Sequence, residues 1–201
     1  KDTDRIGLVT YAGSAGVALE MTSGKDKQKI ISAIDGLVSG GGTHGSAGIN
    51  SAYAMLEKHK IENGINRVIL ASDGDFNVGI YSFNGLIKLI EEKRKSGITL
   101  TTLGFGQGNL NDQNMEQLAN KGNGNYFYID SFKEARKVLE TGLTANMEVV
   151  AKDVKLQIEF NPGKVLEYRL VGYDNRKLRN QDFKNDKIDA GEIGAGHTVT
   201  A

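Results

Sequence analysis

The sequence contains no cysteine, no tryptophan and a single proline among its 201 residues. The absence of cysteine excludes disulfide bonds, thiolate nucleophiles and cysteine-ligated zinc sites. Lysine and arginine number 25, as do aspartate and glutamate, so the formal net charge is zero. Without net charge or a basic stripe with interleaved aromatic residues, nucleic-acid binding has no electrostatic basis. No apolar run approaches the ~20 residues of a membrane-spanning helix, so we expect no membrane span in this segment.

Hydrophobic residues make up 39% of the chain, which is enough for a sizeable core. Their spacing is helical in some segments and strand-like in others. We expect strands at 5–12, 17–21, 66–71 and 98–106, a turn and a strand within 122–130, and helices at 25–37, 46–59, 82–95, 111–119 and 131–150. The link between the first two strands is too short for a parallel return, so this pair must be antiparallel. The alternation that follows predicts an α/β fold, a mostly parallel sheet with helices on both faces.

The pattern changes from Lys152 onward. The segment "KDVKLQIEF" has apolar residues at every second position, which predicts a strand with one face turned inward. These apolar residues are Val154, Leu156, Ile158 and Phe160. We therefore expect residues 1–151 to form the α/β domain and residues 152–201 to form part of a C-terminal β region.

Two polar loops fall near predicted strand and helix ends: "GGGTHGSAG", which contains Thr43, and "SDGDFN", which contains Asp73. In an open parallel sheet, ligands bind beyond the carboxyl ends of the strands. A hydroxyl and a carboxylate on neighbouring loops suit a small hard cation such as Mg²⁺. Thr43 and Asp73 are therefore the candidate metal ligands. Asp75 points to the same edge, and a plain turn remains an alternative for the whole loop.

Other chemistry has weaker support. An EF-hand is rejected because Val78 and Asn84 stand where its loop needs glycine and glutamate. An apolar strand ending in Asp-x-Asp is also typical of phosphohydrolases of the haloacid dehalogenase type, in which one carboxylate is the nucleophile. In that class the strand should be the first of its domain, and a later strand end should carry an acidic pair. The later strand end "TLGFGQGN" has no acidic residue, which argues against this class. We predict no catalytic and no cofactor-binding residue, and we expect that the chain is not an enzyme.

"GGGTHGSAGI" followed by "NRVILASDGDFNVGI" resembles the second and third metal loops of von Willebrand factor type A domains. "DRIGLVTYAG" and "TLTTLGFGQGN" are similar to strands of the same fold, and the resemblance is close to a bacterial subgroup with a C-terminal β region. It implies a metal-ion-dependent adhesion site for Mg²⁺, or for Mn²⁺ or Ca²⁺, with Thr43 and Asp73 as ligands. Because the family's ligand is the first aspartate of the loop, the resemblance makes Asp75 a turn former or a supporting group. It further implies that an acidic residue of a partner protein completes the coordination of the metal. The bacterial subgroup implies a location in the cell envelope, either periplasmic or lipid-anchored.

One part of the family pattern is absent. The first metal loop, Asp-x-Ser-x-Ser, should follow a central first strand, and this chain has no such motif. The resemblance therefore implies a truncated chain or a proteolytic fragment that lacks that strand, the next helix and three oxygen ligands. The backbone edges of the flanking strands would be exposed, and association with another chain could complete the sheet. We expect weak or absent Mg²⁺ binding by the chain alone; a metal-free scaffold with a vestigial site is the alternative.

Overall fold

The computed structural model describes residues 1–11, 16–38, 40, 45–74, 82–106, 110–142, 149–169, 171, 178–185 and 191–195. The chain divides into two compact units, Lys1–Ala135 and Arg136–Ala201. Each unit is described by itself below. The domain boundary that the sequence places near Ala151 stays a prediction.

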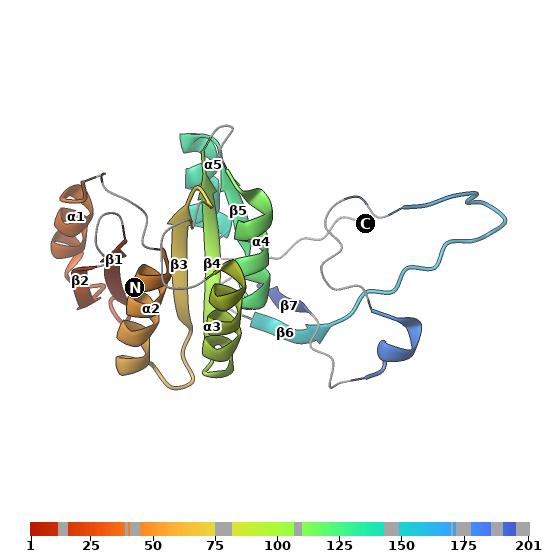
Figure 1. The fold of residues 1–201 in the computed structure, drawn as a ribbon, viewed down its shortest axis with the longest axis horizontal. Coiled ribbons are helices and arrows are strands. Elements are labelled where there is room, and N and C mark those ends of the chain that lie inside the picture. Colours follow the sequence, from red (N-terminus) through yellow and green to blue (C-terminus); the bar gives the residue numbers. More distant parts are fainter. Residues whose placement is uncertain are drawn as a thin grey trace. The chain divides into compact units, whose positions relative to one another are not determined.

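Strands and helices alternate through the first unit (Figure 1). In chain order they are β1 (Arg5–Thr10), β2 (Gly16–Ser23), α1 (Lys27–Asp35), α2 (Gly45–Lys58), β3 (Asn66–Ser72), α3 (Phe83–Lys95), β4 (Ile98–Phe105), α4 (Asp112–Lys121) and β5 (Tyr126–Ile129). The helix α5 (Phe132–Arg136) follows, and the π-helix η1 (Lys137–Gly142) continues directly from it. This order of elements is the one that the hydrophobic spacing predicts up to β5.

The strands form two groups within the first unit. β1 and β2 make an antiparallel pair, as the short link predicts. β3, β4 and β5 make a parallel sheet in that spatial order. Helices flank this parallel sheet, and the α/β prediction is therefore confirmed.

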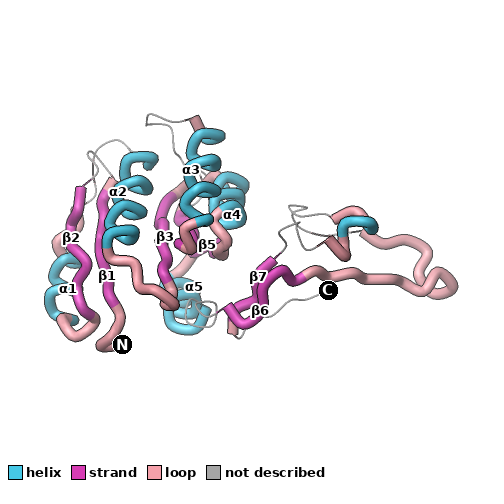
Figure 2. The backbone as a smooth tube through the Cα atoms, turned by 90° about the horizontal axis from the view of Figure 1, so that it is seen from below, coloured by secondary structure: helices cyan, strands magenta, loops and turns pink. Residues whose placement is uncertain are grey.

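The sheet is interrupted between β1 and β3. In the described part of the chain, β1 pairs only with β2, and β3 pairs only with β4. Helix α2 nevertheless packs against both β1 and β3, and Figure 2 shows α2 beside both strands. We call the interval between the facing edges of β1 and β3 the open lane. It lies where the sequence predicts that a central strand is missing.

One face of β3 is covered and the other is bare. On the covered face, α2, α3 and α4 pack against β3 and β4 around a single core. Its buried members are Ile49, Tyr53, Val68, Leu70, Leu86, Ile90, Ile98, Leu100 and Leu118. On the opposite face, Ile69 is 43% exposed and Ala71 is also exposed. Apolar strand residues on both faces are typical of a sheet that is covered on both sides.

Helix boundaries in the first unit follow from local capping. Ser82 caps α3 as predicted, because its hydroxyl accepts a hydrogen bond from the Gly85 N–H at 3.4 Å. After α3, Gly97 adopts a positive φ of 80° that favours glycine and ends the helix. Asn111 caps α4 through its side-chain oxygen, which accepts from the Asn114 N–H at 3.1 Å. These caps fix where the loops at the edge of the sheet begin.

Two expectations for the chain after β5 are wrong. The helix predicted for 131–150 does not reach its predicted end, because Val149 and Val150 belong to the strand β6 (Val149–Val154). Residues 143–148 lie outside the described residues. The β-branched residues of this segment favour a strand, and β6 finds an antiparallel partner in β7 (Gly191–Gly194). The inward strand face predicted for 152–160 is also not formed. Residues 155–160 form no helix or strand, and Leu156, Ile158 and Phe160 are exposed.

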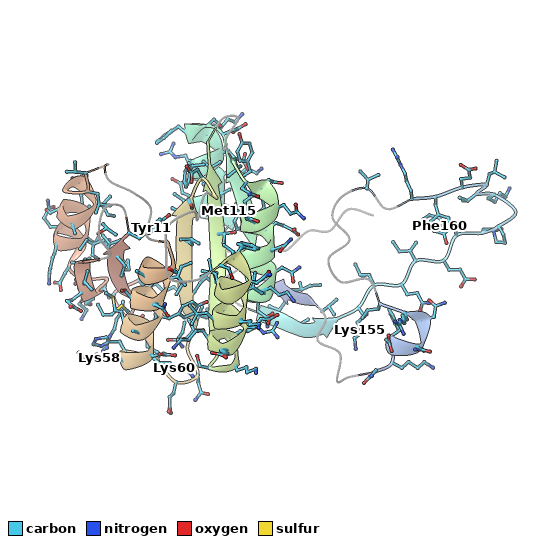
Figure 3. All side chains as sticks on the ribbon, in the orientation of Figure 1. Tyr11, Lys58, Lys60, Met115, Lys155 and Phe160 are labelled. Atoms are coloured by element: carbon cyan, nitrogen blue, oxygen red, sulfur yellow. The ribbon has the colours of Figure 1, made fainter. Side chains whose placement is uncertain are left out.

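The second unit contains an extended arm that turns at Asn161. The Asn161 side-chain oxygen accepts from the Gly163 N–H at 2.8 Å, and its carbonyl accepts from the Lys164 N–H at 2.9 Å. Across this turn, the rings of Phe160 and Tyr168 lie with their centroids 4.5 Å apart. The π-helix η1 and the short 3₁₀-helix η2 (Asn180–Asp182) also belong to this unit. Figure 3 shows the side chains of the arm, including Phe160.

Replacing Asn66 with alanine should lower the free energy of unfolding by about 2–3 kcal/mol. The Asn66 side chain is buried, accepts from the Ile61 N–H at 3.0 Å, and donates to the carbonyls of Ile61 at 2.9 Å and Gly64 at 3.1 Å. Alanine would remove all three of these part-buried hydrogen bonds and leave only the Gly64 N–H bond to the Ile61 carbonyl in this turn. Urea unfolding followed by circular dichroism measures the change. Gln113→Ala, at an exposed position on α4, is the control, and an equal effect of the two substitutions would contradict the prediction.

Candidate functional site

The candidate site lies at the carboxyl edge of the parallel sheet, where β3 ends at Ser72 and Asp73 follows. Gly74 then turns the chain with a φ of 81°, and its N–H donates to the Ser72 hydroxyl at 3.0 Å. A Cβ at Gly74 would lie 2.7 Å from the carbonyl oxygen of Asn111. Both the positive φ and the close approach therefore require glycine here. The Asp-Gly pair that the sequence singles out is a tight turn that places Asp73 at the edge of the sheet.

Asp73 is also tied to the start of α4. Its carbonyl accepts a hydrogen bond from the Asn111 N–H at 3.0 Å. Asn111 is the residue that caps α4, so one residue joins the loop after β3 to the helix after β4. The backbone of Asp73 is thus fixed from two sides, by β3 and by the cap of α4.

Two tyrosines of β5 complete the hydrogen bonding at this edge. The Tyr126 hydroxyl donates to Asp112 Oδ1, and the Tyr128 hydroxyl donates to the carbonyl of Gly106 at 3.0 Å. Asp112 is the first residue of α4, so its carboxylate is used to hold β5 against that helix. Asp73 and Asp112 therefore have different surroundings although both lie near strand ends.

Tyr11 is a residue of this edge that the sequence reasoning missed. It follows β1, and its hydroxyl donates to the carbonyl of Ala71 in β3, so its side chain joins the two edges of the open lane. Figure 3 places Tyr11 between β1 and β3. Burial raises the pKa of Tyr11, a hydrogen bond with the Ser72 side chain works against this rise, and the nearby charge of Asp73 adds to it. No local pattern could have revealed a contact between positions 60 residues apart.

The ring of Tyr11 rests directly on helix α2. A Cβ at Gly48 would lie 2.4 Å from Tyr11 Cβ and 3.0 Å from its Cγ. Only a residue without a side chain lets the ring come this close to the helix backbone. The contact connects the first turns of α2, the end of β1 and the end of β3.

The hydrogen bonds of β4 show which backbone groups of β3 face the open lane. The N–H groups of Leu100 and Thr102 donate at 2.9 Å to the carbonyls of Gly122 and Asn125, which precede β5. Successive residues of a strand direct their backbone groups to opposite edges. The backbone groups of Thr101, which lies between them, are therefore directed toward β3.

The parallel register extends this alternation to β3. Thr101 is paired with Ile69. In a parallel ladder, Thr101 bonds to the residues on either side of its partner, so Ile69 itself faces away from β4. Ala71, two residues further on, faces the same way. The carbonyl that Tyr11 occupies is therefore directed into the open lane.

The described residues test only part of the predicted metal site. Asp73 stands at the edge of the sheet, whereas Thr43, His44 and Asp75 lie outside the described residues. Among those described, no group of three or more histidines, aspartates and glutamates could hold a metal ion. One carboxylate is an incomplete set for a hard cation that takes an octahedron of oxygen ligands. Thr43 and Asp73 as a ligand pair remain a prediction.

The parallel sheet flanked by helices, with the polar Asp73–Gly74 turn after β3, defines an α/β domain. Residues 1–141 match the family model described as "von Willebrand factor type A domain", and the chain belongs to this family. Residues 145–201 match the model described as "Uncharacterized protein YfbK, C-terminal". In the described ranges, no helix combines the length and the apolar character needed to cross a membrane.

The chain is 48% identical over 200 residues to the "Uncharacterized protein YfbK" of Escherichia coli (strain K12). This match covers 100% of the chain but 35% of the relative, so the chain spans about a third of the relative's length. Among solved structures, an aerotolerance-related membrane protein from Bacteroides fragilis is similar with a TM-score of 0.56 and 21% identity, covering 72% of this chain and 81% of that one. Manganese-loaded TRAP protein from Plasmodium vivax is similar with a TM-score of 0.55 and 22% identity, covering 69% and 57%. At this identity the two structures show the fold alone.

Proposed function

We propose that this chain is a protein-binding module in which Asp73 takes part in cation-assisted recognition of an acidic group on a partner protein. The observation that carries the proposal is the position of Asp73, held by a glycine turn and by the cap of α4 at the carboxyl edge of a von Willebrand factor type A sheet. Ligands of open parallel sheets bind at this edge. A structure of similar fold, the TRAP protein, is described as manganese-loaded, which supports a divalent cation as the cofactor class.

The proposal includes a strand from outside residues 1–201 that fills the open lane. Both bordering edges lack a partner strand among the described residues, although α2 packs against both strands. Exposed strand edges are templates for strand addition. Because the E. coli relative is much longer than this chain, another segment of the full-length protein is the proposed source. A strand from a second chain is the alternative source.

The same proposal places the protein in the bacterial cell envelope and assigns it no enzymatic activity. The printed description of the Bacteroides fragilis structure as a membrane protein supports the envelope. The absence of activity follows from the recognition role and is tested by assay. Turnover of p-nitrophenyl phosphate by the full-length protein, lost on Asp73→Ala, would instead support the phosphohydrolase alternative.

Replacing Asp73 with alanine in the full-length protein should reduce Mg²⁺-dependent partner capture at least about tenfold, since a metal-site group is lost. The measurement is affinity capture from envelope extract, quantified by mass spectrometry in Mg²⁺ and in EDTA. Asp35→Ala, which removes an exposed carboxylate at the end of α1, is the matched control and should retain capture. Partners retained equally in EDTA would contradict cation-assisted recognition and favour a metal-free scaffold.

A further inference from the structure

Exposed aromatic side chains lie at the same edge of the sheet as Asp73, on the side away from the open lane. The spatial order β3-β4-β5 continues outward from β3, so β4 and β5 lie on the far side of β3 from that lane. Near their carboxyl ends, Phe105 is 39% exposed and Tyr128 is 42% exposed, and Phe132, which begins α5, is 83% exposed. Exposed groups of large aromatic side chains are typical of binding surfaces. We call these three residues the aromatic rim.

The register of the parallel strands places the aromatic rim beside Asp73. Ser72 is paired with Gly104, so the next residues along the two strands, Asp73 and Phe105, are level with each other. Phe105 is in turn paired with Ile129, the last residue of β5, and α5 begins shortly after it. Because neighbouring strands are ~4.8 Å apart, the rim extends about 10 Å from Asp73 to the end of β5.

The Tyr128 ring is held at this edge by its own hydroxyl. The hydroxyl donates to the carbonyl of Gly106 at 3.0 Å, and Gly106 directly follows Phe105. The hydrogen bond therefore draws the ring toward the end of β4, next to Phe105. A side chain that is already fixed loses little conformational entropy when a partner binds against it.

Phe132 is exposed although its backbone is fixed. Ser131 caps α5, because its hydroxyl accepts from the Glu134 N–H at 3.2 Å and its carbonyl accepts from the Ala135 N–H at 2.9 Å. These bonds set the first turn of the helix, so Phe132 does not belong to a frayed end. Burial of a large aromatic side chain removes roughly 150–250 Å² from water. Of the three rim residues, Phe132 therefore offers a partner the most apolar surface.

We propose that the aromatic rim binds an extended segment of the partner protein. In this segment, the acidic residue that approaches Asp73 is followed, about two to four residues later, by a large apolar residue. This inference rests on the proposed cation-assisted recognition and specifies the sequence that is recognised. An extended chain rises ~3.3 Å per residue, so about three residues span the ~10 Å from Asp73 to the end of β5. Asp130, which is exposed between β5 and α5, disfavours a second acidic residue at the apolar end of the segment.

A displayed library of random peptides, selected on the full-length protein in MgCl₂, tests the recognised sequence. Enriched peptides should contain aspartate or glutamate followed about two to four residues later by tryptophan, phenylalanine, tyrosine or leucine. The most enriched peptide is then synthesised, and its affinity for the full-length protein is measured by fluorescence polarisation. Enriched peptides without this pairing, or no enrichment over an unrelated protein, would overturn the proposal.

Phe132→Ala in the full-length protein should weaken binding of this peptide at least about tenfold, as expected when an aromatic anchor is removed. Phe132→Leu keeps part of the apolar surface and should weaken binding less. Val38→Ala is the matched control, because it shortens an apolar side chain that is 90% exposed after α1, outside the rim. The control should leave the affinity unchanged. Since Phe132 and Val38 are both exposed, the circular dichroism of the protein should be unaffected by either alanine.

The same peptide separates failure of the rim from failure of the proposed function. Binding that is lost in EDTA and on Asp73→Ala, but is unchanged by Phe132→Ala, would leave cation-assisted recognition standing and overturn the rim alone. Binding that is equal in Mg²⁺, in EDTA and on Asp73→Ala would overturn cation-assisted recognition. The rim would then be wrong as well, because its position is defined relative to the acidic group at Asp73.

Discussion

Replacing Gly124 with alanine should lower the free energy of unfolding of the first unit by about 3 kcal/mol or more, the upper range for forced overpacking. A Cβ at Gly124 would lie 2.0 Å from the Leu100 carbonyl oxygen and 2.9 Å from the Thr101 backbone nitrogen. Both atoms belong to the backbone of β4, which is paired on both sides and cannot move aside. The residues of this turn must therefore shift, and they carry the hydrogen bonds that align β5 with β4.

Urea unfolding of residues 1–201, followed by circular dichroism, measures the effect of Gly124→Ala. Gly16→Ala is the matched control, since the nearest atom to an added Cβ there is the Thr10 hydroxyl at an ordinary 3.8 Å. The control should change the free energy of unfolding by less than about 1 kcal/mol. If the Gly124→Ala chain were as stable as the control, the turn after α4 would accommodate an added Cβ, and the prediction would be wrong.

The candidate site was predictable where its signals are local. An apolar run that ends in Asp-Gly indicates a buried strand followed by a turn, and β3 ends at Ser72 with Gly74 in the turn. The N-cap at Ser82 is likewise a residue that acts on its own neighbours. These features depend on groups a few positions apart, so the sequence contains all the information needed to place them.

The Tyr11 contact was not predictable, because it depends on how distant elements come together. Its hydroxyl reaches Ala71 only because α2 draws β1 and β3 to the same side, and its ring fits only because position 48 is glycine. The local sequence around Tyr11, Gly48 and Ala71 contains no pattern that indicates this contact. Glycine in the middle of a helix is a signal of close packing, but it does not name the residue that packs there.

Periodicity predicted which residues share a face but not whether that face is covered. Helix α1 forms as predicted, yet of its apolar stripe Ile30 is buried while Ile31 and Ile34 are exposed. The exposed Leu156 and Ile158 of the second unit follow the same rule. An apolar face is buried only when another element packs against it. The sequence of one helix or strand does not show whether such an element is present.

Residues 1–201 alone should bind Mg²⁺ at least about 100-fold more weakly than the full-length protein, because loss of even supporting groups costs 10–100-fold in metal affinity. The described edge of the sheet offers the Asp73 carboxylate and no cluster of three acidic or histidine ligands. A strand that runs parallel to β3 in the open lane would end beside Asp73, at the carboxyl edge of the sheet, and would bring further oxygen ligands there. Isothermal titration calorimetry with MgCl₂ compares the two forms, and Asp73→Ala in the full-length protein should remove the difference.

The outcome distinguishes three kinds of metal site. A divided site takes ligands from residues 1–201 and from another segment, a complete site lies within residues 1–201, and a vestigial site binds no metal. Equal, micromolar affinity in both forms would mean that residues 1–201 hold a complete site, and the divided site would be wrong. No binding by either form would favour the metal-free scaffold. Strong binding by the full-length protein alone would make occupancy of the open lane the condition for metal binding. In that case β1 and β3 are not only structural strands, because their unpaired edges determine whether Asp73 can act as a ligand.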